Sequence, residues 1–216
     1  MDPLHFCIAT IPIAAYLMLI AGINLSRRTF ITTGVRDLAA LALAVVGFMV
    51  VGPMELFLPE TVASLVGAWV WVPMLVLYAL VTTLILLMMK PRLIAYNTNA
   101  EQLRPVIKEV IAELDSEARW AGDCVIAPRL GVQIAIEAHS GVRNVTLAAV
   151  GPEQDLDGWE KLKNRLQRAL SKESQSPNVH GISYLILSVV LTITIVYTLL
   201  SGRQEIAQAF QEMMRM

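Results

Sequence analysis

Apolar residues are concentrated in four long runs that contain almost no charged side chain. The runs cover residues 4–25, 38–58, 62–89 and 182–200. A helix rises about 1.5 Å per residue, so about 20 apolar residues cross the roughly 30 Å hydrocarbon core of a bilayer. Because lipid cannot satisfy the backbone of a lone strand, each run is expected to be helical. The pattern therefore predicts a multi-pass membrane protein with four transmembrane helices.

A polar insert, residues 91–178, separates the third run from the fourth. Apolar residues recur at helical spacing from Leu103 to Leu114, and residues 132–138 alternate between apolar and polar as a half-buried strand does. The expected elements are a strand over 92–96, a helix that ends near 114, strands over 124–127, 132–138 and 144–150, and a helix over 156–170. This β-α-β-β-β-α order predicts a small α+β domain in which both helices cover one face of a sheet of about four strands.

Short polar residues suggest where several helices begin. Thr98 and Asn99 each precede a Glu or Gln by three residues, which is the pattern of two overlapping capping boxes. Thr33 and Asp37 stand just before the second apolar run, and residues of these types are common where a helix begins. Asp155, Asp157 and Glu160 fit the positive end of a helix dipole better than a calcium loop.

The chain therefore divides into three expected parts. Residues 1–90 hold three transmembrane helices, residues 91–178 form the α+β domain and a linker, and residues 179–216 hold the fourth span and an amphipathic tail. The apolar residues of the tail recur at helical spacing after Gly202. Two interpretations of the tail remain open: it lies on the membrane interface, or it continues the fourth helix.

Composition supports the membrane assignment and narrows the class of partner. Hydrophobic residues make up 56% of the chain and charged residues 16%, a balance outside the usual range of soluble domains. Residues 91–178 hold 12 of the 18 acidic and 11 of the 17 basic residues, so this insert is nearly neutral. Without a cluster of Lys and Arg, we expect no nucleic-acid partner. Cys7 and Cys124 are too few for a disulfide framework or a metal cluster.

Basic residues in the connections predict the orientation. Arg27, Arg28, Arg36, Lys90 and Arg92 fall on one side of the membrane if every run spans it, whereas the opposite connection has no Lys or Arg. The positive-inside rule then places residues 91–178 in the cytoplasm and both termini outside, in a plasma or inner membrane.

Three side chains are candidates for function. Glu55 stands in the outer part of the second apolar run, where a carboxylate either lines a transport pathway or reaches headgroup water beyond Pro53. Arg119 and Trp120 are residue types that anchor protein interfaces, and the alternative for Trp120 is that it covers the domain core.

No motif indicates catalysis. The chain has no Gly-rich phosphate loop, His-Glu-x-x-His, Cys-x-x-Cys or Gly-x-Ser-x-Gly sequence, so we expect no catalytic residue, no cofactor and no metal. The expected function is that of a non-enzymatic adaptor or regulatory component. Its partners would be the lipid bilayer and either another protein, bound by the cytoplasmic domain, or a second copy of the chain. The alternative is a transporter or channel-like component with a cytoplasmic gating domain.

Overall fold

The computed structural model describes residues 3–54, 56, 67–138, 143–152, 154–171, 178 and 180–215. The chain forms two compact units. The membrane unit comprises Met1–Ile20, Leu38–Met88 and Ser183–Met216. The sheet unit comprises Ala21–Asp37 and Met89–Ile182, so it takes in the connection between the first two apolar runs as well as the polar insert.

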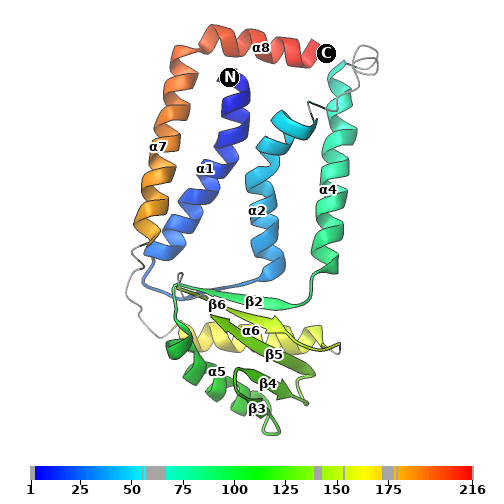
Figure 1. The fold of residues 1–216 in the computed structure, drawn as a ribbon, viewed down its shortest axis with the longest axis vertical. Coiled ribbons are helices and arrows are strands. Elements are labelled where there is room, and N and C mark those ends of the chain that lie inside the picture. Colours follow the sequence, from blue (N-terminus) through cyan, green and yellow to red (C-terminus); the bar gives the residue numbers. More distant parts are fainter. Residues whose placement is uncertain are drawn as a thin grey trace. The chain divides into compact units, whose positions relative to one another are not determined.

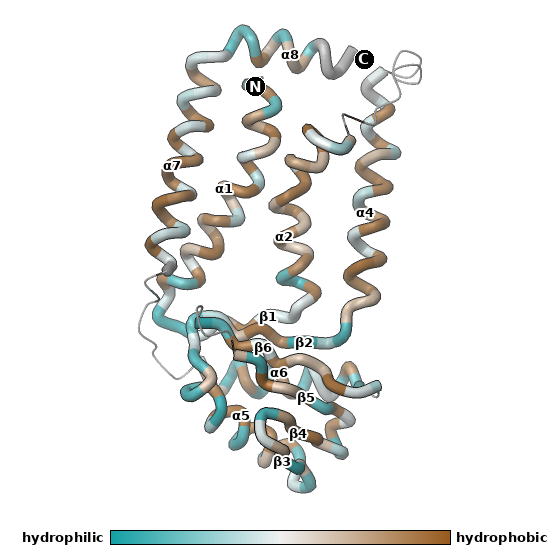
Figure 2. The backbone as a smooth tube through the Cα atoms, in the orientation of Figure 1, coloured by the Kyte–Doolittle hydropathy of each residue, from teal (hydrophilic) through white to brown (hydrophobic). Residues whose placement is uncertain are grey.

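Four helices of the chain are long and apolar enough to cross a membrane, as predicted. They are α1 (Pro3–Leu25), α2 (Gly34–Met49), α4 (Trp71–Met88) and α7 (His180–Ser201). Figure 2 shows their apolar character, which extends over most of each helix. After Met49 the second span widens into a π-helical segment, η1 (Val50–Met54), that contains Pro53. Proline has no N–H for the regular helical bond, and its ring crowds the preceding turn, so a wider turn there has a clear local cause.

Small residues let the helices of the membrane unit approach closely. A Cβ atom placed on Gly47 of α2 would lie 2.0 Å from the carbonyl oxygen of Ile8 in α1, so only glycine fits this crossing. The α7 residue Ser188 donates a hydrogen bond of 3.0 Å to the carbonyl oxygen of Ala14 in α1. In lipid such close packing and interhelical hydrogen bonds take over the role that the hydrophobic effect has in water.

The C-terminal tail forms a separate helix. Helix α8 (Arg203–Arg215) begins after a bend at Gly202, and Figure 1 shows that it runs across the direction of α7. It therefore does not continue the fourth span. A 3-10 turn, η2 (Gly67–Val70), contacts α8.

The sheet unit is built on a six-stranded antiparallel sheet with the order β1-β2-β6-β5-β4-β3. Its elements in chain order are β1 (Phe30–Thr33), β2 (Arg92–Tyr96), α5 (Ala100–Leu114), β3 (Arg119–Ala121), β4 (Cys124–Ala127), β5 (Val132–Ala138), β6 (Asn144–Ala149) and α6 (Leu156–Leu170). The predicted strands and both helices of the insert are present. Figure 1 shows α5 and α6 on the same side of the sheet.

The expectation of about four strands is wrong, because two short strands join the sheet. Strand β1 comes from the connection between α1 and α2 and pairs with β2 in the register Phe30↔Tyr96. Strand β3 forms a hairpin with β4 whose turn contains Gly122 at φ +61°. Neither strand is long enough to show a period of its own in the sequence, and each is defined by the strand beside it.

A single hydrophobic core lies between the sheet and the two helices. Ile134 of β5, Leu147 of β6, Ile107 of α5 and Leu162 of α6 are each at most 2% exposed. Ile31 of β1 belongs to the same core although it comes from outside the polar insert. The core side chains follow the predicted periods of 3.6 on the helices and 2 on β5.

Two of the three expected helix starts have the predicted side-chain hydrogen bond to the backbone. Thr33 accepts the backbone N–H of Arg36 at 3.4 Å, and Asp155 accepts that of Asp157 at 3.1 Å. The predicted capping boxes before α5 are wrong: Asn99 is the N-cap residue but its side chain makes no cap hydrogen bond. Thr98 extends the β2–β6 pairing instead, since its N–H bonds to the carbonyl of Arg143 at 3.0 Å.

Candidate functional site

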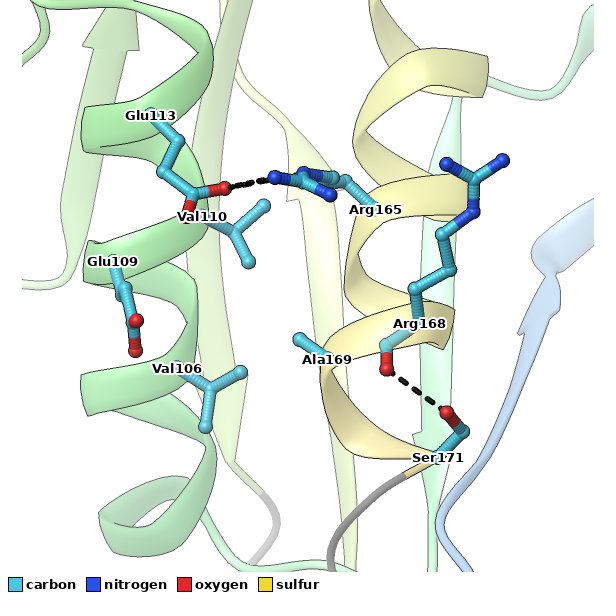
Figure 3. Close-up of a pocket in the computed structure, with 8 residues that line it drawn as sticks. All are labelled: Val106, Glu109, Val110, Glu113, Arg165, Arg168, Ala169 and Ser171. Atoms are coloured by element: carbon cyan, nitrogen blue, oxygen red, sulfur yellow. Dashed lines mark hydrogen bonds and ion pairs between the residues drawn. The ribbon is translucent and has the colours of Figure 1, made fainter.

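A groove lies between α5 and α6, the two helices that cover the sheet. It has a volume of about 550 Å³. Figure 3 shows its eight lining residues, which are Val106, Glu109, Val110 and Glu113 of α5, Arg165, Arg168 and Ala169 of α6, and Ser171. We call this feature the helix groove.

The helix groove exists because the two helices turn different faces toward the sheet and toward each other. The large apolar residues of both helices, such as Ile107 and Leu162, are buried in the core. Where the helices face each other they carry only Val106, Val110 and Ala169 as apolar side chains. Val110 is buried, and Val106 and Ala169 are partly exposed, so a small apolar floor is left open.

An ion pair crosses the helix groove. The Arg165 guanidinium donates from Nη2 to Oε2 of Glu113 at 2.7 Å and from Nε to the same oxygen at 3.1 Å. Both side chains are close to half exposed, at 46% and 47%, so solvent screens the pair and its net contribution is about 0–1 kcal/mol.

The remaining charges of the groove are open to a partner. Within the part of the chain that the structure describes, the side chains of Glu109 and Arg168 make no ion pair or hydrogen bond with another residue. Figure 3 shows the Arg168 guanidinium pointing away from α5. The unpaired charge on the α5 side is therefore the carboxylate of Glu109, one helical turn from the paired Glu113.

The two interface candidates of the sequence, Arg119 and Trp120, do not form one patch. They are neighbours on the edge strand β3, where successive side chains point to opposite faces. Trp120 is half-buried against the core, and the Lys108 ammonium lies 5.6 Å from its ring centroid. This position agrees with the interpretation that Trp120 covers the domain core. Arg119 is exposed on the helix-free face, and neither residue lines the helix groove.

Glu55, the third candidate, lies outside the described residues. Several polar groups of the described spans are hydrogen-bonded within the fold, whereas Nε1 of Trp71 in α4 is buried without a partner among the described residues. Along α7, hydroxyls donate to the carbonyl four residues earlier at Thr192, Thr194, Thr198 and Ser201. In the sheet unit Asn24 accepts from the amide of Asn178 at 3.1 Å.

Among the described residues, no three His, Cys, Asp or Glu side chains come together as metal ligands would. Both cysteines are free thiols; Cys7 is buried and Cys124 is exposed.

The sequence alone did not indicate the helix groove or the burial of one carboxylate, Asp115. The groove depends on two helices that are about 50 residues apart in sequence, and no local pattern shows that they lie side by side. Asp115 follows α5 directly and is 2% exposed. A carboxylate at a helix end is ordinarily solvated, so only the tertiary fold reveals its burial.

No protein-family model matches this chain, and no curated protein or solved structure matches it. The function is therefore inferred from the helix groove and from the membrane helices themselves.

Proposed function

We propose that this protein is a membrane-anchored adaptor whose sheet unit binds another protein in the helix groove. The four apolar helices act as the anchor. The bound segment would present a small apolar side chain to Val106 and Ala169, and a Lys or Arg to Glu109. Those are the side chains that complement an apolar floor beside an unpaired carboxylate.

The observation that carries the proposal is the contrast between the polar groups of the two units. Pathways for ions or solutes need polar groups that face a cavity. The α7 hydroxyls donate instead to carbonyls within the membrane unit. The helix groove, by contrast, keeps Glu109 unpaired within the described part of the sheet unit. The contrast favours an adaptor over a transporter.

We further propose that the sheet unit is cytoplasmic, in a plasma or inner membrane, with both termini outside. Strand β1 pairs with β2, so the connection after α1 and the segment after α4 belong to one folded unit. The five basic residues Arg27, Arg28, Arg36, Lys90 and Arg92 therefore share one side of the membrane. The positive-inside rule assigns the side of the membrane that carries such basic residues to the cytoplasm.

Site-specific photo-crosslinking in cells tests the binding proposal. A photoreactive amino acid at Ala169 lies in the helix groove, and one at Ile126 lies on the helix-free face of the sheet, where Ile126 is 46% exposed. We expect one crosslinked protein species from position 169 and none from position 126. Glu109→Lys should abolish that species, because it replaces the attraction for a cation by repulsion.

The matched control for this test is Glu101→Lys, which makes the same charge change at an exposed position of α5 outside the groove. It should leave the crosslinked species unchanged. A species of twice the chain's mass would assign the groove to a second copy and overturn the proposal of a different partner. Equal crosslinking from both positions would overturn it as well.

A further inference from the structure

A second hollow of the sheet unit, which we call the junction pocket, lies where the chain enters and leaves two apolar helices. Its volume is about 310 Å³. Thr33 and Val35 contribute from the end of β1 and the first turn of α2, and Met89 and Arg92 from the segment after α4. Leu156 and Lys163 contribute from α6. The volume lies at the small end of the range for ligand pockets, about 300–1,000 Å³.

The Arg92 guanidinium in the junction pocket has an unused donor. Its side chain lies across Gly34, where an added Cβ atom would meet the Arg92 Cγ and Nε at 2.3 Å. The Nε–H is buried and has no hydrogen-bond partner in the described part of the chain. Buried N–H groups of charged side chains normally have an acceptor, so the described residues leave this donor of Arg92 unsatisfied.

The second cation of the junction pocket, Lys163, is also incompletely paired. Its side chain is 17% exposed, and its ammonium lies 3.9 Å from the Glu160 carboxylate, which is too far for a hydrogen bond. Glu160 is itself 67% exposed and turned mostly to solvent. The lining of the junction pocket thus includes two cations, Arg92 and Lys163, and one carboxylate, Glu160, so the net charge of these side chains is positive.

Two of the segments that line the junction pocket adjoin spans along the chain. Val35 lies in the first turn of α2, and Met89 directly follows the last residue of α4. Residues that are one position from the end of a span lie at headgroup depth. The pocket also carries exposed apolar side chains, with Leu156 at 70% and Val35 at 42% exposure. An adjoining hollow shares Leu156 and adds the cation Lys90.

We propose that the junction pocket binds the phosphate headgroup of an anionic phospholipid. Arg92 and Lys163 supply the donors to the phosphate oxygens, and Leu156 and Val35 contact the glycerol and the first methylene groups. The combination of two cations with exposed apolar side chains at headgroup depth matches an amphiphile better than a soluble anion. This site is separate from the helix groove, and its failure would leave the adaptor proposal untouched.

Native mass spectrometry of the full chain in mild detergent tests this proposal. After delipidation the protein is titrated with phosphatidylglycerol or with phosphatidylcholine of the same acyl chains. We expect phosphatidylglycerol to bind more tightly. The double variant Arg92→Gln/Lys163→Gln should weaken phosphatidylglycerol by roughly tenfold or more, since each basic residue near an anionic lipid is worth about 1 kcal/mol.

The matched control is Lys108→Gln/Lys161→Gln, which removes two exposed cations of α5 and α6 that line neither the junction pocket nor the helix groove. It should bind phosphatidylglycerol as the wild type does. If the double variant does not fold, Lys163→Gln alone decides, because it removes no hydrogen bond of the described fold and should still weaken binding by about fivefold.

Two results would overturn the proposal. One is equal phosphatidylglycerol binding by the wild type and by the pocket variants. The other is saturable binding of inorganic phosphate without any preference for phosphatidylglycerol over phosphatidylcholine, which would make the ligand a soluble anion.

Discussion

Asp115 connects the end of α5 to the turn between β4 and β5 through its carboxylate. Oδ1 accepts the backbone N–H of Glu117 at 2.9 Å, and Oδ2 accepts that of Arg129 at 2.7 Å. Among the described residues it is the one buried charged side chain. Its burial is tolerable because backbone donors replace the water that a carboxylate loses on folding.

We predict that Asp115→Ala lowers the free energy of unfolding of the sheet unit by about 2–4 kcal/mol, because the N–H of Arg129 loses its acceptor. Urea unfolding of the full chain in mild detergent, followed by tryptophan fluorescence, measures this loss. The control is Asp123→Ala, an exposed aspartate paired with Arg104, for which we expect less than about 1 kcal/mol. Equal losses for the two variants would contradict the role given to Asp115.

At the scale of elements, strong periods in the sequence predicted the long helices and β5, whereas β1 was missed. Phe30 to Thr33 are four residues between two apolar runs and show no period. Their β-branched side chains were the available signal. What makes them a strand is pairing with β2, about 60 residues later, and such a long-range partner cannot be read from a local pattern.

We predict that β1 is needed to stabilise the sheet unit. Ile31→Ala removes a core side chain that is 5% exposed and should cost about 2–4 kcal/mol. Hydrogen exchange of the β2 amides in the full chain measures this effect, and we expect faster exchange. Thr32→Ala, on the opposite face of the same strand, is the control. Unchanged β2 exchange in Ile31→Ala would show that β1 is dispensable.

At the scale of the whole molecule, the four spans were predictable because lipid admits few structures other than a helix for a lone apolar segment. The helix groove and the junction pocket were not. Each is formed by residues from separate elements. Glu113 and Arg165 form an ion pair across the helix groove, and Arg92 and Lys163 line the junction pocket, so these sites exist only in the folded unit.

The native thiols test the proposed orientation. Cys124 is exposed in the sheet unit, so a membrane-impermeant maleimide should label it only after the cells are permeabilised. In a Cys124→Ser background, Gln211→Cys on the exposed face of α8 should instead be labelled in intact cells. Labelling of Cys124 in intact cells would place the sheet unit outside and reverse the orientation.

If the sheet unit carries the activity while the spans anchor it, complementation of a deletion strain should depend on the helix groove and not on Glu55. Two variants are compared at equal expression: Glu109→Lys in the helix groove and Glu55→Gln in the second apolar run. We expect Glu109→Lys to fail to complement and Glu55→Gln, which removes the carboxylate that a pathway would need, to complement fully. Complementation by Glu109→Lys together with failure of Glu55→Gln would contradict the adaptor function and indicate transport.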